Sequence, residues 1–313
     1  MKKLYILACC LIFVFEGFAQ SRKYVSQFSH MQSYFNPALT GYEGSNFRGL
    51  IRNQWAGFEG APMTYAGSLE IDIADFSKGS NPDKNALGIN ILHDQYGAFI
   101  ETELITSYAS RIQLAEKTAL RLGVGVNYNT VRLDGNNLTT EQSNDPKVVQ
   151  YLNGFADMQV LDFNIGIALT HPNYYISYAV HNVNQGAINS GDIFMERKPM
   201  VSIVQAGYRN AFTENLTLAT NFMYRGQADL PDNVEFNFKI LMMEKIWLGA
   251  GHRIDYANNF QLGILLPVMR IGYVYELPMS RSYLLPNTTH EFLAVIPLFR
   301  KNNSSDRNKA LIW

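Results

Sequence analysis

The 313-residue sequence contains 26 basic and 27 acidic side chains, which gives a formal net charge of −1 at pH 7. A charge this close to zero argues against nucleic acid as a partner. The only two cysteines, Cys9 and Cys10, lie in a segment that we predict is removed on export. The mature chain would therefore have neither disulfides nor thiolate chemistry.

The N-terminus, Met1–Ala19, has the features of a secretory signal peptide. A charged start precedes the apolar core Leu4–Phe15, and small residues in Gly17–Ala19 allow cleavage before Gln20. The core is too short for a membrane helix, which takes about 20 residues. Ile6–Cys9 weakly resembles a lipoprotein signal, but cleavage there would leave an apolar stretch in the mature chain. No later apolar run is long enough for a helical span, which leaves a soluble periplasmic protein or an outer-membrane barrel.

The rest of the chain alternates apolar and polar residues over short segments. In Leu120–Thr130, for example, Leu122 and Val124 flank the small Gly123. A period of two places alternate side chains on opposite faces of a sheet, and about 9–11 residues let a strand cross a bilayer. We predict an all-β fold of about 14 antiparallel strands. Their expected bounds are Asn46–Trp55, Met63–Ile73, Ala86–Gln95, Ile100–Leu114, Ala119–Leu133, Val160–Leu169, Tyr174–Val183, Val201–Ala211, Leu216–Arg225, Val234–Met242, Ile246–Ile254, Phe260–Leu266, Val268–Leu277 and His290–Phe299.

The connections between these strands, numbered in chain order, differ in length between odd and even numbers. The odd-numbered ones include the three longest, Asp134–Gln159, Asn184–Met200 and Pro278–Thr289, whereas the even-numbered ones are short except for Ala74–Asn85. Outer-membrane barrels have short periplasmic turns and longer outer loops. A β-sandwich alternates in the same way along its strands but has no reason to sort its loops. The sequence therefore favours a single transmembrane barrel in the outer membrane, with both termini on the periplasmic side.

The two faces of the strands differ in chemistry. We expect one set to face lipid, namely Leu122, Val124, Phe163, Ile165, Phe236 and Phe238, and another to face the lumen, namely Arg121, Asn127, Asp162, Asn164, Glu235 and Lys239. Lumen charges of both signs fit an interior that holds an inserted segment, although a solvated interior explains them too. Small lumen residues leave room for such a segment: Gly123, Gly125, Gly166, Ala168, Gly249 and Gly251. We therefore divide the chain into a signal peptide (1–19), an N-terminal plug (20–45), a barrel (46–299) and a C-terminal tail (300–313).

Catalytic patterns are missing from the sequence. The six histidines are scattered, and neither a G-x-S-x-G elbow nor a phosphate-binding loop is present. Gly123-x-Gly125 lacks the third glycine of a dinucleotide site. Ser177 and His181 share a face of one predicted strand, but such pairs are common on lumen faces. We expect no catalytic, cofactor-binding or metal-binding residues and no cofactor.

Two stretches resemble a known family. The first contains Gln27-Phe28-Ser29 and Tyr34-Phe35-Asn36-Pro37-Ala38-Leu39-Thr40-Gly41, and the second is Arg52-Asn53-Gln54-Trp55-Ala56-Gly57-Phe58-Glu59-Gly60-Ala61-Pro62-Met63-Thr64. Both resemble signatures of the PorP/SprF family of type IX secretion system membrane proteins. A weaker segment, Tyr178–Gln185, is similar except at Asn182-Val183.

The resemblance implies an outer-membrane barrel, related in shape to the long-chain fatty-acid channels, that supports protein secretion and the attachment of adhesin-like proteins in gliding bacteria. Its implied partners are outer-membrane lipid, exported adhesin-like proteins and a periplasmic, peptidoglycan-linked assembly. Family members commonly end on an aromatic residue, and here either Phe299 or Trp313 would serve. The alternative function is a FadL-like channel for a hydrophobic or small solute.

The signature also marks a candidate docking site in the first outer hairpin. Its residues are Arg52, Asn53, Gln54, Trp55, Gly57, Phe58, Gly60 and Pro62. The hairpin is either a rigid barrel lip with aromatic anchors or a docking surface for an exported protein. Aromatic and aliphatic residues in two other outer loops are further contact candidates: Tyr151, Phe155, Ile193 and Phe194. On the periplasmic side, the expected contact regions are Ala74–Asn85 and the C-terminal tail.

Overall fold

The computed structural model describes residues 23–76, 84–137, 151, 154–192, 197–228, 230–279 and 288–299. Several regions discussed above lie outside these residues: the expected signal peptide Met1–Ala19, Ile193 and Phe194, and the tail 300–313 with Trp313.

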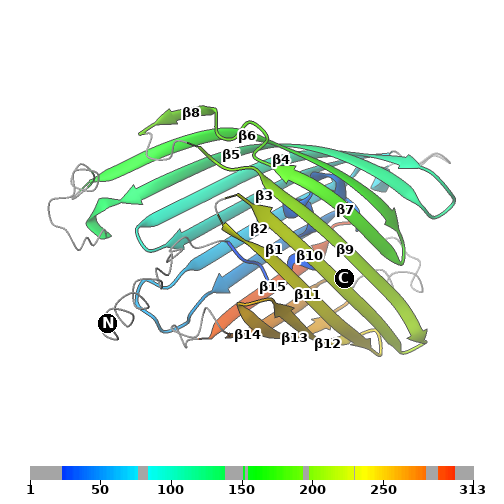
Figure 1. Ribbon diagram of the computed structural model, residues 1–313. Coiled ribbons are helices and arrows are strands. Elements are labelled where there is room, and N and C mark those ends of the chain that lie inside the picture. Colours follow the sequence, from blue (N-terminus) through cyan, green and yellow to red (C-terminus); the bar gives the residue numbers. More distant parts are fainter. Residues whose placement is uncertain are drawn as a thin grey trace, which may run out of the picture.

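The chain folds into one antiparallel sheet that closes on itself (Figure 1). Fourteen strands form the closed wall, and the short β8 pairs only with the outer part of β6. Strands β1 and β15 pair with each other and close the barrel. The strands are β1 (Asn46–Asn53), β2 (Met63–Asp72), β3 (Asn85–Tyr96), β4 (Phe99–Gln113), β5 (Ala119–Asp134), β6 (Phe155–His171), β7 (Tyr174–His181), β8 (Ile188–Gly191), β9 (Val201–Thr213), β10 (Leu216–Gln227), β11 (Leu230–Met242), β12 (Ile246–Arg253), β13 (Ala257–Leu265), β14 (Arg270–Pro278) and β15 (Thr289–Pro297). The predicted barrel and its strand number are confirmed.

Alternation decides which side chains meet lipid. Leu122 is 45% exposed on the outside of the wall, whereas the neighbouring Arg121 is 3% exposed and points into the lumen. The other residues predicted to face lipid are also exposed, and those predicted to face the lumen are also buried. This facing is confirmed because it follows from the two-residue period of each strand.

Strand β6 begins earlier than the sequence predicts. Alternation continues through Ala156 and Met158, which are buried, and Phe155 pairs with Asp134 of β5. Residues 155–159, expected in an outer loop, therefore extend the β5–β6 hairpin. In Figure 1 the end of this hairpin extends further to the left than the neighbouring β3–β4 turn.

The connections divide the barrel into two rims. We call the rim with the β1–β2, β3–β4, β5–β6 and β7–β9 connections the long-loop rim, and the opposite one the short-turn rim. In outer-membrane barrels the long loops face outward. The helices are short: η1 (Phe28–His30), α2 (Gln32–Phe35), η2 (Pro37–Leu39), η3 (Ile73–Asp75) and η4 (Gly135–Asn137). In the described part of the chain, no helix is long and apolar enough to cross a membrane.

Residues 23–45, here called the N-terminal segment, run through the lumen (Figure 1). At one end, Lys23 Nζ lies 2.7 Å from Glu101 Oε1, beside the β3–β4 turn of the long-loop rim. At the other end, Ser45 donates to Asp75 of η3 at the short-turn rim. The barrel strands begin and end at the short-turn rim as expected, but Lys23 lies at the opposite rim. The expectation that both termini share one side is wrong for the start of the N-terminal segment, because this segment crosses the lumen from the long-loop rim to the short-turn rim before β1 begins.

Candidate functional site: the occupied lumen and the first outer hairpin

The Asn36-Pro37-Ala38 turn sits against two glycines of the wall. The Asn36 side chain accepts a hydrogen bond from Ala38 N at 2.9 Å and so starts η2. A Cβ atom at Gly123 would collide with the backbone of Ala38, and one at Gly166 would collide with Asn36 Oδ1. These two glycines therefore make room for the inserted segment.

Side chains of the wall hold the backbone of the N-terminal segment directly. Arg121 Nε donates to the carbonyl oxygen of Ala38 at 2.8 Å. His181 Nε2 lies 2.9 Å from the carbonyl oxygen of Phe35. Because these contacts are buried, each one satisfies a polar group that water cannot reach. The histidine of the weaker motif thus has a structural partner, and its Nε2 is engaged there.

Two wall carboxylates accept hydrogen bonds from the segment, Glu70 near the short-turn end of β2 and Glu103 toward the long-loop end of β4. Glu70 accepts from Ser33 Oγ at 2.9 Å and from the backbone N of Gly41 at 2.7 Å. Glu103 accepts from the Tyr34 hydroxyl at 2.6 Å. Hydrogen bonds to ionised acceptors are stronger than neutral ones.

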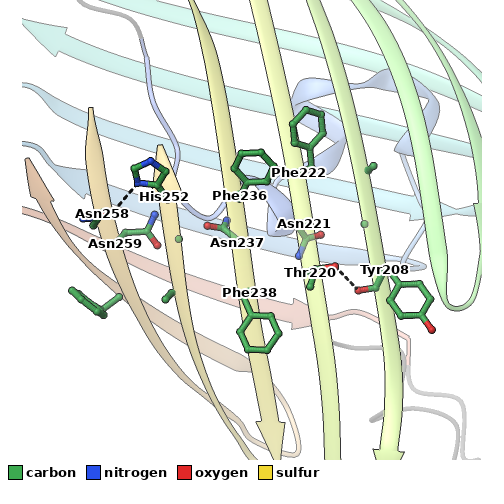
Figure 2. A pocket seen from close by; sticks show the side chains of 15 residues that line it. Tyr208, Thr220, Asn221, Phe222, Phe236, Asn237, Phe238, His252, Asn258 and Asn259 are labelled. Atoms are coloured by element: carbon green, nitrogen blue, oxygen red, sulfur yellow. Dashed lines mark hydrogen bonds between the residues drawn. The ribbon is translucent and has the colours of Figure 1, made fainter. Parts of the chain in front are cut away.

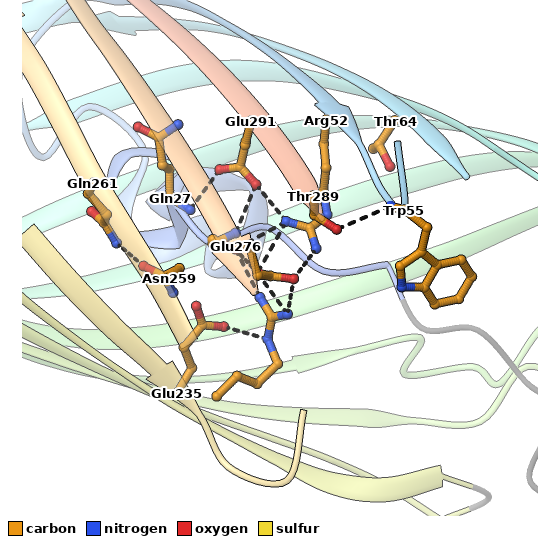
Figure 3. A network of polar contacts seen from close by, with 12 residues as sticks. Gln27, Arg52, Trp55, Thr64, Glu235, Asn259, Gln261, Glu276, Thr289 and Glu291 are labelled. Atoms are coloured by element: carbon orange, nitrogen blue, oxygen red, sulfur yellow. Dashed lines mark hydrogen bonds and ion pairs between the residues drawn. The ribbon is translucent and has the colours of Figure 1, made fainter. Parts of the chain in front are cut away.

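A cluster of buried charges fastens the start of the segment (Figure 3). Arg52 lies 2.8 Å from Glu276 and 3.2 Å from Glu291. Arg253 lies 3.0 Å from Glu235 and 3.2 Å from Glu276. We call these five side chains the carboxylate cluster.

The N-terminal segment supplies further donors to the carboxylate cluster. Glu291 accepts from the backbone N atoms of Ser26 at 3.0 Å and Gln27 at 2.8 Å. Ser26 Oγ donates to Glu276 at 2.6 Å. The buried charges are therefore both paired and hydrogen-bonded, as buried ions in proteins must be.

A second group of charges lies near the short-turn rim. Glu43 Oε2 lies 3.0 Å from Arg48 and 3.1 Å from Arg270. Burial by itself raises the pKa of Glu43, but the charges of Arg270 and Arg48 outweigh it, so that this pKa is lowered. Glu43 is thus held as a carboxylate.

One histidine of the segment lies beside a buried lysine of the wall. Lys239 Nζ donates to Ser29 Oγ at 2.7 Å and lies 3.0 Å from His30 Nε2. Burial and the charge of Lys239 lower the pKa of His30 well below its usual range. A neutral ring can accept a hydrogen bond from the ammonium group.

Apolar side chains pack between the N-terminal segment and the wall. Phe28, Met31 and Phe35 of the segment pack into a buried cluster with Leu50 of β1 and Leu92 of β3. The ring of Trp247 lies inside the barrel against two glycines of the neighbouring strands, Gly263 and Gly272. In this part of the barrel, the segment and the wall therefore form a packed core, and a cavity of about 150 Å³ remains beside Lys23 and Lys198.

The signature residues split into two groups. Arg52 is 1% exposed and belongs to the carboxylate cluster. Pro62 is buried, and its carbonyl oxygen accepts from Gln54 N at 3.0 Å, which closes the base of the hairpin. Asn53 ends β1 and is half-buried.

The remaining signature residues form the hairpin tip. The backbone N of Trp55 donates to Thr289 Oγ1 at 3.3 Å, so the hairpin is fastened to the start of β15 (Figure 3). Gly57 and Gly60 have φ values of 91° and 71°, a region that side chains disfavour. Phe58 is 50% exposed. The structure thus brings Arg52 and Pro62 into the barrel and leaves Phe58 at the surface.

Sequence reasoning missed two features of this site. Glu291 was not among the expected lumen charges, although its position alternates with the inward-facing Leu293 and Val295 of β15. Lys23 and Lys198 also were not expected to share a pair of carboxylates, Glu101 and Glu103. The partners of these lysines come from distant parts of the chain, so no local pattern marks them.

The outer-loop candidates differ in environment. Phe155 is 60% exposed, and the Arg132 guanidinium lies 5.6 Å from its ring centre. Tyr151 instead packs against the small buried cluster of Ala98, Leu133 and Ala156. Among the described residues, no group of three or more His, Cys, Asp or Glu side chains is placed to hold a metal ion.

These features define an outer-membrane β-barrel whose lumen is filled by its own N-terminal segment. The chain belongs to the PorP/SprF family of type IX secretion system membrane proteins, whose profile matches residues 17–296. None of the curated proteins matches this sequence.

The chain is also similar to several solved structures. Omp33 of Acinetobacter baumannii is 10% identical, with a TM-score of 0.46 over 81% of this chain and 97% of that chain. The toluene transporter TbuX of Ralstonia pickettii is 13% identical, with a TM-score of 0.47 over 84% of this chain and 91% of that one. A FadL homologue of Pseudomonas aeruginosa is 9% identical, with a TM-score of 0.40 over 81% and 89% of the two chains.

Proposed function

We propose that this protein is a non-enzymatic component of type IX secretion that works by binding other proteins. It would support the export or surface attachment of adhesin-like proteins, and through them gliding motility. Family membership supports the secretion role. The observation that carries the proposal is the packed lumen: with the interior occupied by residues 23–45, the two rims are the surfaces left for partners.

On the long-loop rim, the first outer hairpin is the proposed contact for an exported protein. Its base is fixed by the bond between Gln54 and Pro62 and by the bond between Trp55 and Thr289. Its tip presents Phe58 to solvent. Aromatic side chains on a preorganised support are frequent anchors of protein interfaces.

On the short-turn rim, we propose a contact with a periplasmic, peptidoglycan-linked component. Phe76, which follows η3, packs edge-on against Phe299 with ring centres 4.6 Å apart. Both rings are also exposed. This pair joins Phe76, at the start of the β2–β3 connection, to Phe299, the last described residue, and it marks the proposed contact surface.

The test is surface display of exported proteins in cells that carry the Phe58→Ala variant. We expect display of one or a few adhesin-like proteins to fall several-fold while the amount of folded barrel stays constant. Phe292→Ala is the matched control, because Phe292 is 55% exposed on the outer wall within β15, away from both rims. Normal display in a strain that lacks the whole gene, together with a nutrient phenotype, would refute the secretion role.

The alternative is a FadL-like channel for a hydrophobic or small solute. Such a channel needs an open lumen or a gap in its wall. Strand β7 ends early at His181, but Asp162 of β6 accepts from the backbone N atoms of Asn184 at 3.1 Å and Gly186 at 2.8 Å. The following chain is thereby tied to β6. Together with the packed lumen, this bonding weighs toward the secretion role.

A further inference from the structure

A groove runs across the outer face of the barrel over strands β9 to β13 (Figure 2). It has a volume of about 650 Å³, and its lining combines outward-facing side chains with the inward-facing Asn221, Asn237 and Asn259 of the same strands. Sites for small ligands typically have about 300–1,000 Å³, so the groove is large enough to hold one. Neither the packed lumen nor the rims account for it.

Small side chains between aromatic ones create the groove. In one row across the strands, Thr220 lies between Tyr208 and Phe238, and Ala250 lies between Phe238 and Phe260. All three rings are exposed. Because adjacent strands are only about 4.8 Å apart, each small residue leaves a slot with an aromatic ring on either side.

The position of the groove identifies its surroundings. Neighbouring outward-facing residues of the same strands are apolar and exposed, including Leu248, Leu262 and Ile264. This face of a membrane barrel meets the hydrocarbon of the bilayer. A slot of one strand width between flat rings has the shape of an unbranched hydrocarbon chain. The molecules that surround the barrel at this depth are lipids, so we take the chain to be an acyl chain.

One end of the groove is polar. His252 Nδ1 lies 2.7 Å from Asn258 Oδ1, next to the β12–β13 turn of the long-loop rim (Figure 2). The Asn258 amide nitrogen donates to Met279 Sδ, which fixes its oxygen toward the histidine. An amide oxygen only accepts, so Nδ1 of His252 carries the proton, and in that tautomer Nε2 is an acceptor.

We propose that this groove binds an acyl chain of an outer-leaflet lipid, with a hydroxyl or amide N–H of that lipid donating to His252. The apolar slots hold the chain, and the polar end lies on the side of the membrane that faces outward. The lipid thus occupies a defined position on this wall.

The test uses the full-length barrel in nanodiscs of phosphatidylethanolamine that contain a phosphatidylcholine with a diazirine in its acyl chain. After illumination, cross-links are mapped by mass spectrometry. We expect cross-links around Phe238 and Ala250 to exceed those around Leu122 and Val124, on another part of the wall, several-fold. Uniform labelling of both regions would overturn the proposal.

Variants test whether the slots cause the enrichment. Ala250→Leu fills one slot with an apolar group on the lipid face, so the barrel should fold normally and the enrichment should disappear. Thr220→Leu fills the other slot and serves as a second, independent variant. Leu248→Met is the matched control on β12 and should keep the enrichment. Unchanged enrichment in a folded Ala250→Leu barrel would contradict the proposal.

A competition experiment tests the polar end. A 3-hydroxy fatty acid should suppress the groove cross-links at a several-fold lower concentration than the same fatty acid without the hydroxyl. His252→Phe should remove this difference but keep the cross-links. Equal competition in the unmodified protein would refute the role of His252, and in-cell cross-links from the groove to a protein would refute the lipid as occupant.

Discussion

His181 Nε2 lies 2.9 Å from the carbonyl oxygen of Phe35, a residue 146 positions earlier in the chain. This contact joins two of the family-like motifs, because Phe35 precedes the Asn36-Pro37-Ala38 turn and His181 ends β7. A family-like motif on a barrel strand thus holds the N-terminal segment in the lumen. The same holds for Arg52, which begins the longest signature and binds the carboxylate cluster.

Gly123 should be required for the N-terminal segment to stay in place. In Gly123→Ala the new Cβ would collide with the backbone of Ala38, whereas at Gly49 nothing lies within 4 Å. We expect a cysteine introduced by Ser33→Cys to become labelled much faster by a thiol reagent in the Gly123→Ala background. The expected absence of native cysteines from the mature chain makes this readout clean. Equal labelling in Gly123→Ala and in the control Gly49→Ala would contradict the prediction.

Loss of Arg52 should strongly destabilise the barrel. Arg52→Met leaves Glu276 and Glu291 buried next to an apolar side chain, and breaking a buried ion pair in this way typically costs about 3–5 kcal/mol. The free energy of unfolding in urea would measure this loss. Arg132→Met is the control: Arg132 pairs with Asp157 at 2.7 Å, but both side chains are about half exposed. It should leave the free energy of unfolding nearly unchanged, and a loss as large as that of Arg52→Met would argue against a special role for burial.

The intact protein should conduct ions poorly. Residues 23–45 occupy the lumen, so purified barrels in planar bilayers should give only small, rare current steps. Deletion of residues 20–42 should raise the conductance, because it removes the apolar core of the segment. Large and steady currents from the intact protein would instead favour the channel alternative.

A charge on the lipid face should be costly. Phe236 is 46% exposed at the centre of β11, so Phe236→Arg should cost about 2–4 kcal/mol, the range for a basic residue near the middle of a bilayer. Phe212 is 68% exposed next to a short turn, where the same change should cost only about 0–1 kcal/mol. Urea unfolding of barrels inserted into lipid vesicles compares the two variants. A smaller loss for Phe236→Arg than for Phe212→Arg would place the bilayer elsewhere on the barrel.

The sequence predicted which residues would form much of the candidate site. Gly123 and Gly166 were expected to leave room for an inserted chain, and both contact the Asn36-Pro37-Ala38 turn. The signature was expected to form an outer hairpin, and it does so from Gln54 to Pro62. The roles within the signature were not predictable, because Arg52 and Phe58 lie six positions apart and yet one is buried and the other exposed.

By itself, the sequence determined the fourteen strands of the closed wall, apart from the early start of β6, and the face that each side chain takes; it did not reveal the short β8. These properties are local: alternation of Arg121 with Leu122 assigns both residues once the chain is a strand. Only the tertiary structure decided that the N-terminal segment starts at the long-loop rim, and that Arg52 meets Glu276 and Glu291, which are 224 and 239 positions away. Such pairs depend on barrel closure, which places β1 beside β15 and one strand away from β14. They also depend on the register of every strand pair between β1 and β14, because each register shifts the next strand along the barrel axis. No short stretch of residues contains that information.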